Sequence, residues 1–274
     1  MNWKNAGENP FIGWFRMLIT EACLSLVGVR FIFQRQFLWF ESRRRLVYLF
    51  CSPWAISRRF LDDRGELEAQ GYGETPLVTL EAVARRLELS TGDRILELGC
   101  GTGRNCVWLA ANYGCHIDGV EQIPTLVRIS QRLLKGSSLT DKVTLSCMDM
   151  FELDMSSYRL VYVDCTAMSE ACIRQVAMLC AGLPNEARVV TVNASLSELM
   201  PERFQLERVF PGLFIWGWSD MRIQRVGMPE DYLDSPQVDS QSDHFNGNCG
   251  SFAAADTEAG DSALATGAAQ GMNQ

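Results

Sequence analysis

Three glycines at every second position, Gly99, Gly101 and Gly103, follow directly after the alternating segment Ile95-Leu96-Glu97-Leu98. Glycine lets a ligand approach the backbone closely and adopts the positive φ angles that tight turns require. Glu97 adds a carboxylate just ahead of the same turn. These residue types predict a site for a nucleotide-like ligand between a strand and the amino terminus of a helix. The alternative interpretation is a turn with a structural role only.

The spacing of the glycines excludes two other nucleotide sites. Dinucleotide sites follow the pattern G-x-G-x-x-G, whereas here the third glycine comes one residue early and Arg104 stands at the position of the last glycine. The chain also lacks G-x-x-x-x-G-K-[ST], which excludes a phosphate-binding P-loop.

Three further acidic residues follow predicted strands. Glu121 ends the second strand, Asp149 comes just after the third, and Asp164 follows the fourth. A carboxylate at the end of the second strand can accept two hydrogen bonds from a ribose diol. The alternative for Glu121 is a solvated residue at a strand end, and Asp164 could instead bond backbone amides.

The hydrophobic pattern predicts the elements that position these groups. Strands are expected over 95–98, 116–121, 143–147, 160–163, 189–192, 204–210 and 214–226, and helices begin near 76, 104, 124 and 169. Thr75 is expected to cap the first of these helices, with Pro76 as its first residue. Pro211-Gly212 is expected to join the last two strands in an antiparallel hairpin. The prediction is a Rossmann-like α/β fold, mostly parallel, with an antiparallel end.

Charge is distributed unevenly over the 274 residues. The formal net charge of −8 argues against a general nucleic-acid binder. Residues 1–64 nevertheless contain ten Lys and Arg against five Asp and Glu, and residues 228–274 contain eight acidic residues and no basic ones. The composition of residues 235–274 predicts a disordered tail.

The scattered cysteines lack metal-ligand spacing, so no metal site is predicted, and they suit a reducing cytoplasm.

The amino-terminal segment is rich in aromatic residues and arginine. Helices are expected near 12–33, 36–51 and 54–69, and no transmembrane segment or signal peptide is predicted because charges interrupt the apolar runs. One interpretation is a helical cap that packs on the catalytic domain. The other is a surface that contacts anionic lipid or a partner. We therefore expect an amino-terminal extension over 1–70, a central domain over 71–227 and an acidic tail over 228–274.

The string Leu96-Glu-Leu-Gly-Cys-Gly-Thr-Gly103 closely resembles the first motif of the class I S-adenosylmethionine-dependent methyltransferases. The resemblance covers roughly residues 70–226 and implies S-adenosylmethionine as cofactor. By position, the glycine turn would hold the methionine end and Glu97 its ammonium. The resemblance further implies contacts from Glu121 to the ribose and from Asp149 with Met150 to the adenine. Gln122 is also expected to bind the cofactor.

Narrower similarities point toward protein-lysine methyltransferases. Tyr72-Gly73-Glu74-Thr75 resembles the loop ahead of the cofactor motif in lysine methyltransferases without a SET domain, which implies that Tyr72 and Glu74 contact the cofactor. The segments 121–127, 155–158 and 187–190 are similar to the family that methylates a lysine of the ATP-synthase c-subunit. The chain departs from the first family after the fourth strand, where Asp164-Cys165-Thr166 replaces Asn-Asn-Phe.

Methyl transfer requires an aligned acceptor that loses its proton. Asp164 and Tyr72 are the candidate catalytic residues, with Glu74 nearby, since the two histidines lie in unsuitable positions. Cys165 lacks the Pro-Cys context of a covalent nucleophile, and the D-P-P-Y string of nucleic-acid amino methyltransferases is absent. The prediction is a cytoplasmic methyltransferase that acts on a protein lysine or a small molecule. A methyltransferase-fold subunit that binds partners without catalysis is the other class.

Overall fold

The computed structural model describes residues 34–65 and 72–227. The chain divides into two units, Met1–Ser235 and Pro236–Gln274, and all described residues lie in the first. The predicted helix near 12–33 and the acidic tail lie outside the described residues. Within the described ranges, no helix is long and apolar enough to cross a membrane.

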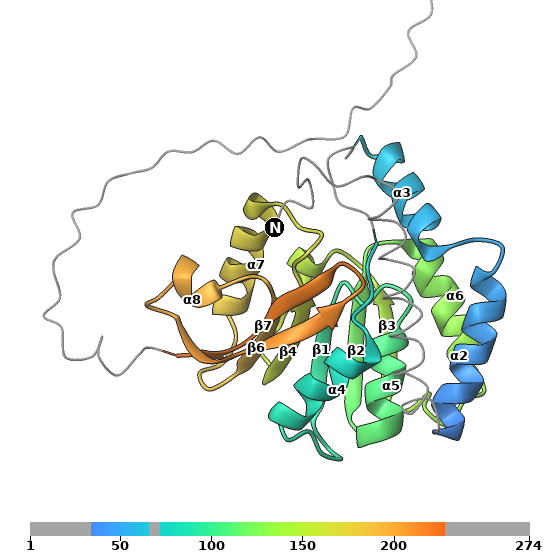
Figure 1. The fold of residues 1–274 in the computed structure, drawn as a ribbon, viewed down its shortest axis with the longest axis horizontal. Coiled ribbons are helices and arrows are strands. Elements are labelled where there is room, and N and C mark those ends of the chain that lie inside the picture. Colours follow the sequence, from blue (N-terminus) through green and yellow to red (C-terminus); the bar gives the residue numbers. More distant parts are fainter. Residues whose placement is uncertain (1–33, 66–71, 228–274) are drawn as a thin grey trace, which may run out of the picture. The chain divides into compact units, whose positions relative to one another are not determined.

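A mixed sheet of seven strands forms the centre of the domain (Figure 1). The spatial order is β3-β2-β1-β4-β5-β7-β6, and only β7 runs antiparallel to its neighbours β5 and β6. The strands are β1 (Arg94–Leu98), β2 (His116–Glu121), β3 (Val143–Cys147), β4 (Leu160–Asp164), β5 (Arg188–Val192), β6 (Phe204–Phe214) and β7 (Gly217–Val226). The predicted Rossmann-like fold with an antiparallel end is confirmed.

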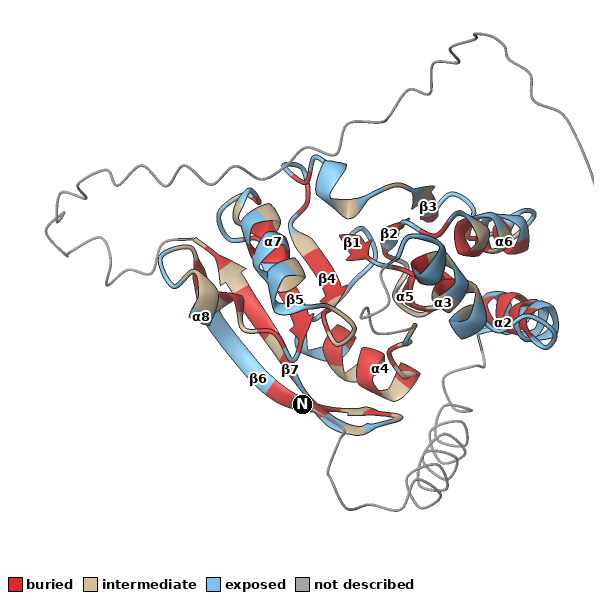
Figure 2. Cartoon of the chain, turned by 90° about the horizontal axis from the view of Figure 1, so that it is seen from above, coloured by how far each residue is buried: buried red, intermediate tan, exposed pale blue. Residues whose placement is uncertain are grey.

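Helices cover both faces of the sheet. They are α2 (Arg35–Tyr48), α3 (Pro53–Asp63), α4 (Leu77–Arg86), α5 (Arg104–Tyr113), α6 (Pro124–Leu134), α7 (Glu170–Ala181) and α8 (Leu196–Leu199), with a short 3-10 turn, η2 (Met150–Glu152), after β3. Ile95 of β1 belongs to a buried cluster with α4, α5 and α6, whereas its neighbour Leu96 belongs to a second cluster with α7. This alternation follows from the two-residue period of a strand, and Figure 2 shows the buried residues concentrated between the layers.

The carboxyl hairpin differs from its prediction. Pro211 and Gly212 lie inside β6, paired with Asp220 and Ser219, and the chain turns later, ahead of Gly217. Proline is tolerated because β6 is an edge strand, and its outer side has no neighbouring strand to which a backbone N–H would donate. Gly212 serves packing instead of turning, since an added Cβ would lie 2.7 Å from Thr79 Cγ2 of α4.

The start of α4 also differs. Pro76 occupies the N-cap position and no side chain caps the helix. Thr75 is buried, and its hydroxyl lies 2.5 Å from the hydroxyl of Tyr162 on β4. A tertiary contact therefore replaces the local capping bond that the sequence predicted. Helix α7 begins near residue 169 as predicted and has a side-chain cap, since Ser169 Oγ accepts a hydrogen bond from the Cys172 amide at 3.2 Å.

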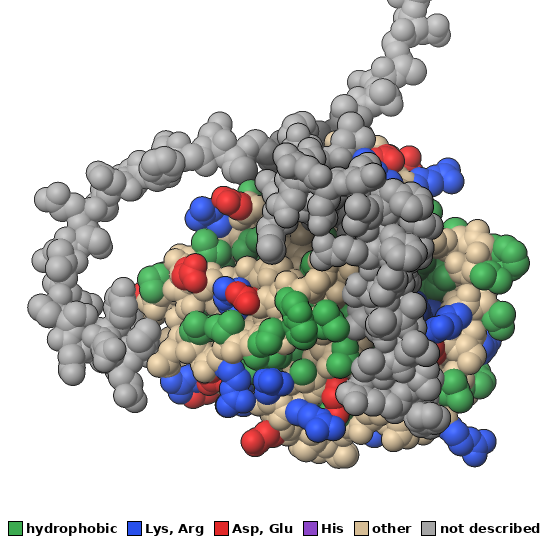
Figure 3. Space-filling model, in the orientation of Figure 1, with side chains coloured by type: hydrophobic (Ala, Val, Ile, Leu, Met, Phe, Trp, Pro, Cys, Tyr) green, Lys and Arg blue, Asp and Glu red, His purple; other side chains and the backbone are tan. Residues whose placement is uncertain are grey.

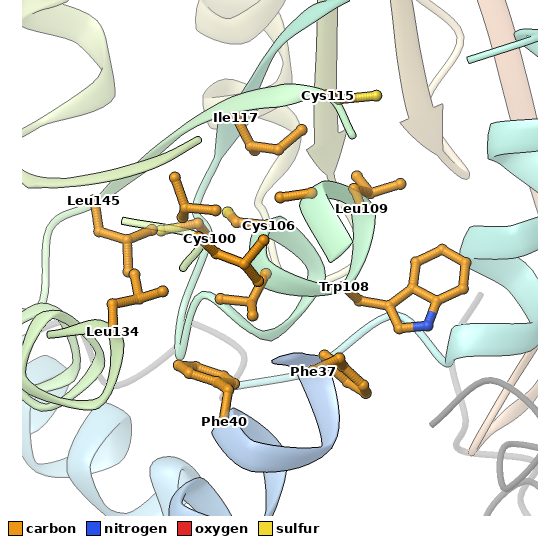
Figure 4. Packing of buried hydrophobic residues seen from close by; sticks show 14 of the residues in the cluster. Phe37, Phe40, Cys100, Cys106, Trp108, Leu109, Cys115, Ile117, Leu134 and Leu145 are labelled. Carbon is orange, nitrogen blue, oxygen red and sulfur yellow. The ribbon is translucent and has the colours of Figure 1, made fainter. Parts of the chain in front are cut away.

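Helix α2 packs on the domain through two phenylalanines. Phe37 and Phe40 are fully buried and point toward Trp108 of α5 and its neighbours (Figure 4). The aromatic residues of residues 34–65 thus divide into a buried set and an exposed set, since Trp39 next to Phe40 is 40% exposed. This helix shares the core of the sheet domain.

Replacing Phe40 with Ala should lower the free energy of unfolding by about 3–5 kcal/mol, because the substitution leaves a cavity among rigid neighbours. Trp39→Ala on the same helix is the matched control and should cost at most about 1 kcal/mol. Urea denaturation followed by circular dichroism measures both. Equal losses in the two variants would show that α2 does not contribute a specific packing face.

Candidate functional site

The carboxyl ends of β1 and β4 meet at the point where the strand order changes direction. From β1 the chain continues outward through β2 and β3, then returns to place β4 on the other side of β1. Open α/β sheets bind ligands at such a point. A small cavity of about 20 Å³ lies here, which is room for about one water molecule. Its lining includes Tyr72, Glu74, Glu97, Gly99, Gly101, Arg104, Asn105, Tyr162 and Asp164.

The glycine turn has the backbone conformation that its composition indicates. Gly99, Gly101 and Gly103 have φ angles of 74°, 54° and 66°, a region that other residues rarely adopt. A Cβ added to Gly101 would lie 2.6 Å from Cε2 of Tyr72, and one added to Gly103 would lie 2.8 Å from Leu145. Gly101 and Gly103 therefore need glycine for both conformation and space, and Gly99 needs it for conformation alone.

The side chains of Tyr72 and Glu74 lie over this turn. Glu74 Oε1 accepts hydrogen bonds from the Tyr72 hydroxyl at 2.5 Å, from Thr102 Oγ1 at 2.5 Å and from Arg44 Nη1 at 3.1 Å. Burial raises the pKa of Glu74, but the charges of Arg44 and Arg104 outweigh it, so the net shift is downward. Glu74 is therefore an ionised carboxylate held by cationic and hydroxyl groups.

Helix α2 supplies two charged groups to this site. Glu41 is buried and accepts from Arg44 Nε at 2.7 Å, and its Oε2 lies 3.5 Å from Arg104 Nε. Burial raises the pKa of Glu41, but hydrogen bonds and charges from the arginines lower it to about 2. The guanidinium of Arg44 is in turn held between Glu41 and Glu74, so the amino-terminal helix forms one side of the charge network.

Glu97 lies under the glycine turn, facing α5. Its two carboxylate oxygens accept from Asn105 Nδ2 and from the Cys106 thiol, both at 2.9 Å. Burial raises the pKa of Glu97 to about 7, against these hydrogen bonds, which lower it. The charge of this carboxylate therefore changes near neutral pH. Asn105 Oδ1 is buried and has no hydrogen-bond partner among the described residues.

Glu121 holds the turn from the end of β2. Its Oε2 accepts from the Gly101 amide at 3.0 Å and its Oε1 from the Ile123 amide at 2.9 Å. Burial raises its pKa, while these amides lower it, and the net shift is upward. Each oxygen keeps a lone pair for a further donor. Both oxygens of the carboxylate predicted to bind a ribose thus already accept hydrogen bonds from backbone amides.

The residues predicted for the adenine lie further along the same sheet edge. Asp149 is exposed and caps η2, accepting from the Phe151 amide at 3.0 Å, and Met150 begins that turn. Neither residue lines the small cavity, and neither does Gln122 or Gly103. The structure therefore brings Tyr72, Glu74, Glu97, Gly99 and Gly101 together in one cavity and leaves the other predicted residues at the adjoining strand ends.

Asp164 borders the cavity from the end of β4. Its Oδ1 accepts from the amide and the hydroxyl of Thr166 at 3.0 and 2.7 Å. Its Oδ2 is buried with no hydrogen-bond partner in the described part of the chain. Burial raises the pKa of Asp164, although the Thr166 hydrogen bonds lower it. A buried carboxylate oxygen with a raised pKa can accept a proton from a bound group.

Several residues of this site escaped the sequence analysis. Glu41, Arg44 and Asn105 carried no motif, and only the fold brings them to the glycine turn. Arg104 offered a signal, because it replaces the glycine of the dinucleotide pattern. Its Nε is buried and donates no hydrogen bond within the described ranges, although Glu41 and Glu74 lie within ion-pair distance.

Two of the segments that resemble lysine methyltransferases, 155–158 and 187–190, lie away from the cavity, whereas the Tyr72 loop borders it and Glu121 of segment 121–127 holds the glycine turn. Tyr158 is buried at the amino ends of the strands, with its hydroxyl 2.9 Å from Asp118 Oδ2 and its ring 5.1 Å from the guanidinium carbon of Arg94. Ala187 and Val190 are fully buried in and beside β5. Tyr158, Ala187 and Val190 therefore have structural contacts and do not line the cavity.

Comparison with known proteins places this site in a recognised domain. Residues 95–202 match the family model described as a methyltransferase domain. The chain is 27% identical over 73 residues to Methyltransferase GfsG of Streptomyces halstedii, which covers 27% of this chain and 26% of that protein. It is 31% identical over 71 residues to a probable fatty acid methyltransferase of Pseudomonas putida, covering 26% of this chain and 18% of that protein. The match thus spans about a quarter or less of these relatives.

A solved RNA methyltransferase from Salinibacter ruber aligns with 58% of this chain and 97% of its own, at 20% identity and a TM-score of 0.49. The match of residues 95–202 begins within β1 and ends beyond α8, so it includes the glycine turn, Glu121, Asp149 and Asp164. This match confirms the resemblance seen in the sequence. The part of the chain from β1 to just beyond α8 is therefore similar to a methyltransferase domain.

Proposed function

We propose that this protein transfers the methyl group of S-adenosylmethionine to a small organic acceptor bound beside Asp164. One observation carries the proposal: Asp164, which has a buried carboxylate oxygen with no hydrogen-bond partner among the described residues, lines the same cavity as the glycine turn. A methyl donor held by the turn and an acceptor held at Asp164 would therefore be adjacent. Bound S-adenosylmethionine supplies an electrophilic methyl group, and the protein contributes alignment and a proton acceptor.

The residues present fit the cofactor. Gly101 offers a cradle that a Cβ would fill, and the unpartnered oxygens of Asn105 and Asp164 can accept hydrogen bonds. We assign Glu97 to the ammonium of the methionine end, Glu121 with Gln122 to the ribose, and Asp149 with Met150 to the adenine. Arg44 and Arg104, which now hold the Glu74 carboxylate, suit the carboxylate of the same methionine end.

A cavity of about 20 Å³ is far smaller than the cofactor. Tyr72 and Glu74 must therefore move aside, or rearrange around the ligand, when it binds. Tyr72 stays in reach of the reacting groups, but burial and the neighbouring Glu74 raise its pKa well above the usual value. A phenol held neutral donates hydrogen bonds, so we assign orientation to Tyr72 and proton acceptance to Asp164.

A small acceptor is favoured over a protein lysine. The relative from Pseudomonas putida is named for a fatty acid. Of the segments that suggested lysine, only the Tyr72–Thr75 loop borders the cavity, and Tyr158, Ala187 and Val190 are buried away from it. Cell extract incubated with the protein and methyl-labelled S-adenosylmethionine tests the acceptor after separation into protein, nucleic acid and small molecules. Label is expected in the small-molecule fraction.

The other outcomes are equally informative. Label in protein that is recovered as methyl-lysine after hydrolysis would replace the proposed acceptor by the lysine alternative. Cofactor binding without label in any fraction would instead favour the non-catalytic binding subunit. Thermal stabilisation by S-adenosylmethionine separates this last case from a protein that does not bind the cofactor at all.

Cofactor affinity should rise with pH between about 5.5 and 7 and level off above. Glu97, with a pKa of about 7, is neutral below that range and must lose its proton to attract an ammonium. The dissociation constant should therefore fall by up to about tenfold per pH unit below 7. Calorimetric titration measures it, and Glu97→Gln should remove the slope while Asp164→Asn keeps it. A flat profile in the unmodified protein would contradict the assignment of Glu97.

A further inference from the structure

Large apolar side chains are exposed where α2 ends and α3 begins. Leu46, Leu49, Phe50 and Trp54 are 66, 70, 90 and 56% exposed, and they fall within nine consecutive residues. Single exposed apolar residues are common on proteins, but a contiguous group marks a site of interaction. Phe50 in particular has almost its whole side chain in solvent.

The fold does not need these side chains. Helix α2 packs on the domain through a separate face formed by Phe37, Phe40, Glu41, Arg44 and Tyr48. The buried residues of α2 recur at helical spacing and form one face. Leu46 does not belong to this face, and Leu49 and Phe50 follow the end of the helix. Ser52 caps helix α3 by accepting a hydrogen bond from the Ala55 amide, and Pro53 is the first residue of the helix. The start of α3 is therefore fixed without the side chain of Trp54.

Arginines flank the apolar group in the sequence, and one of them, Arg45, also pairs with Glu41 at 2.8 Å. Arg43, Arg45 and Arg59 are exposed, and the guanidinium of Arg43 lies 4.3 Å from the centroid of the Trp39 ring. The exposed acidic residues of 34–65 are Asp62 and Asp63 at the far end of α3. In a chain with a net charge of −8, this is a locally positive surface. Figure 3 shows hydrophobic and basic side chains side by side along the right edge, where Figure 1 places α2.

We propose that this α2–α3 surface, formed by Leu46, Leu49, Phe50 and Trp54 with Arg43, Arg45 and Arg59, binds the face of an anionic lipid bilayer. The apolar side chains enter the boundary between headgroups and acyl chains, and the arginines contact lipid phosphates. Tryptophan suits that boundary because one part of its ring system is polar. The contact is peripheral, since no helix among the described residues can span a bilayer.

Charge and composition favour lipid over two other occupants. A second copy of the chain would bring the same arginines against one another, which opposes association. The acidic segment 228–274 complements the arginines in charge. Its large apolar residues are few and scattered, so it does not match four apolar side chains within nine residues. An anionic bilayer supplies both negative charge and an apolar phase.

Vesicle sedimentation with the full chain tests the proposal. Vesicles of phosphatidylcholine with about one third phosphatidylserine should bind the protein, and vesicles of phosphatidylcholine alone should bind it at least about tenfold more weakly. The double variant Leu49→Ser/Phe50→Ser should lose at least about tenfold in affinity. Arg43→Gln/Arg59→Gln should bind severalfold more weakly and respond less to added salt. These residues are exposed, so the melting temperature should stay unchanged.

Trp218→Ser is the matched control, because Trp218 is 67% exposed on β7, away from the α2–α3 surface. It should bind vesicles as the unmodified protein does. Equal binding to both vesicle types, absence of binding, or full binding by Leu49→Ser/Phe50→Ser would overturn the proposal. A dimer in light scattering that becomes a monomer in that double variant, with no vesicle binding by the parent protein, would assign the surface to self-association instead.

Discussion

Replacing Gly101 with Val should weaken S-adenosylmethionine binding by at least about a thousandfold, which corresponds to roughly 4 kcal/mol. Gly101 has a φ of 54°, and a Cβ there would lie 2.6 Å from the ring of Tyr72. The added side chain would occupy the space directly above the turn, where we place the methionine end of the cofactor. Isothermal calorimetry with S-adenosylmethionine or its demethylated product gives the affinity.

The substitution also strains the backbone, so its control must carry the same strain elsewhere. Gly136→Val meets this need, since Gly136 has a φ of 80° and nothing lies within 4 Å of an added Cβ. Both variants should lose stability from the left-handed conformation. Only Gly101→Val should lose cofactor binding while it remains folded by circular dichroism. Unchanged affinity in folded Gly101→Val would remove the assignment of the glycine turn.

Asp164→Asn should lower kcat by about 10²–10⁴, the range expected when a general base is removed. The substitution keeps the shape of the side chain and an oxygen for Thr166, but it removes the proton acceptor at Oδ2. The affinity for S-adenosylmethionine should change by less than about threefold, because Asp164 is assigned to the acceptor side. Initial rates with the acceptor found by extract labelling measure the effect.

Thr166→Val separates catalysis from local structure. It removes the hydroxyl hydrogen bond to Asp164 Oδ1 at 2.7 Å and keeps the carboxylate. The loss of that bond raises the pKa of Asp164 further, so the rising limb of the pH–rate profile should move to higher pH with a smaller loss of kcat. A kcat for Asp164→Asn equal to that of the unmodified protein would exclude Asp164 as the base.

The local sequence pattern was sufficient to predict most strands and helices of the sheet domain and the glycine turn. Strands β1 to β5 and helices α4 to α7 appear where hydrophobic period and breakers predicted them, because burial on one or both faces imposes that period. The β6–β7 hairpin turns later than predicted, and α8 was not predicted. Gly99, Gly101 and Gly103 do have positive φ, and Glu121 does lie against the turn. The division of the chain at residues 70 and 227, the roles of individual residues and a cytoplasmic location stay predictions.

Only the tertiary structure decided the surroundings of the turn. Glu41 and Arg44 lie far ahead of the motif in sequence, yet α2 packs through Phe37 and Phe40 so that both charges reach Glu74 and Arg104. The Thr75 hydroxyl bonds to the Tyr162 hydroxyl instead of capping a helix, and Pro211-Gly212 lies within an edge strand instead of a turn. Short-range patterns record the period and the turns of the backbone. They do not record which distant side chains compete for the same buried space, and that competition determines the lining of this site.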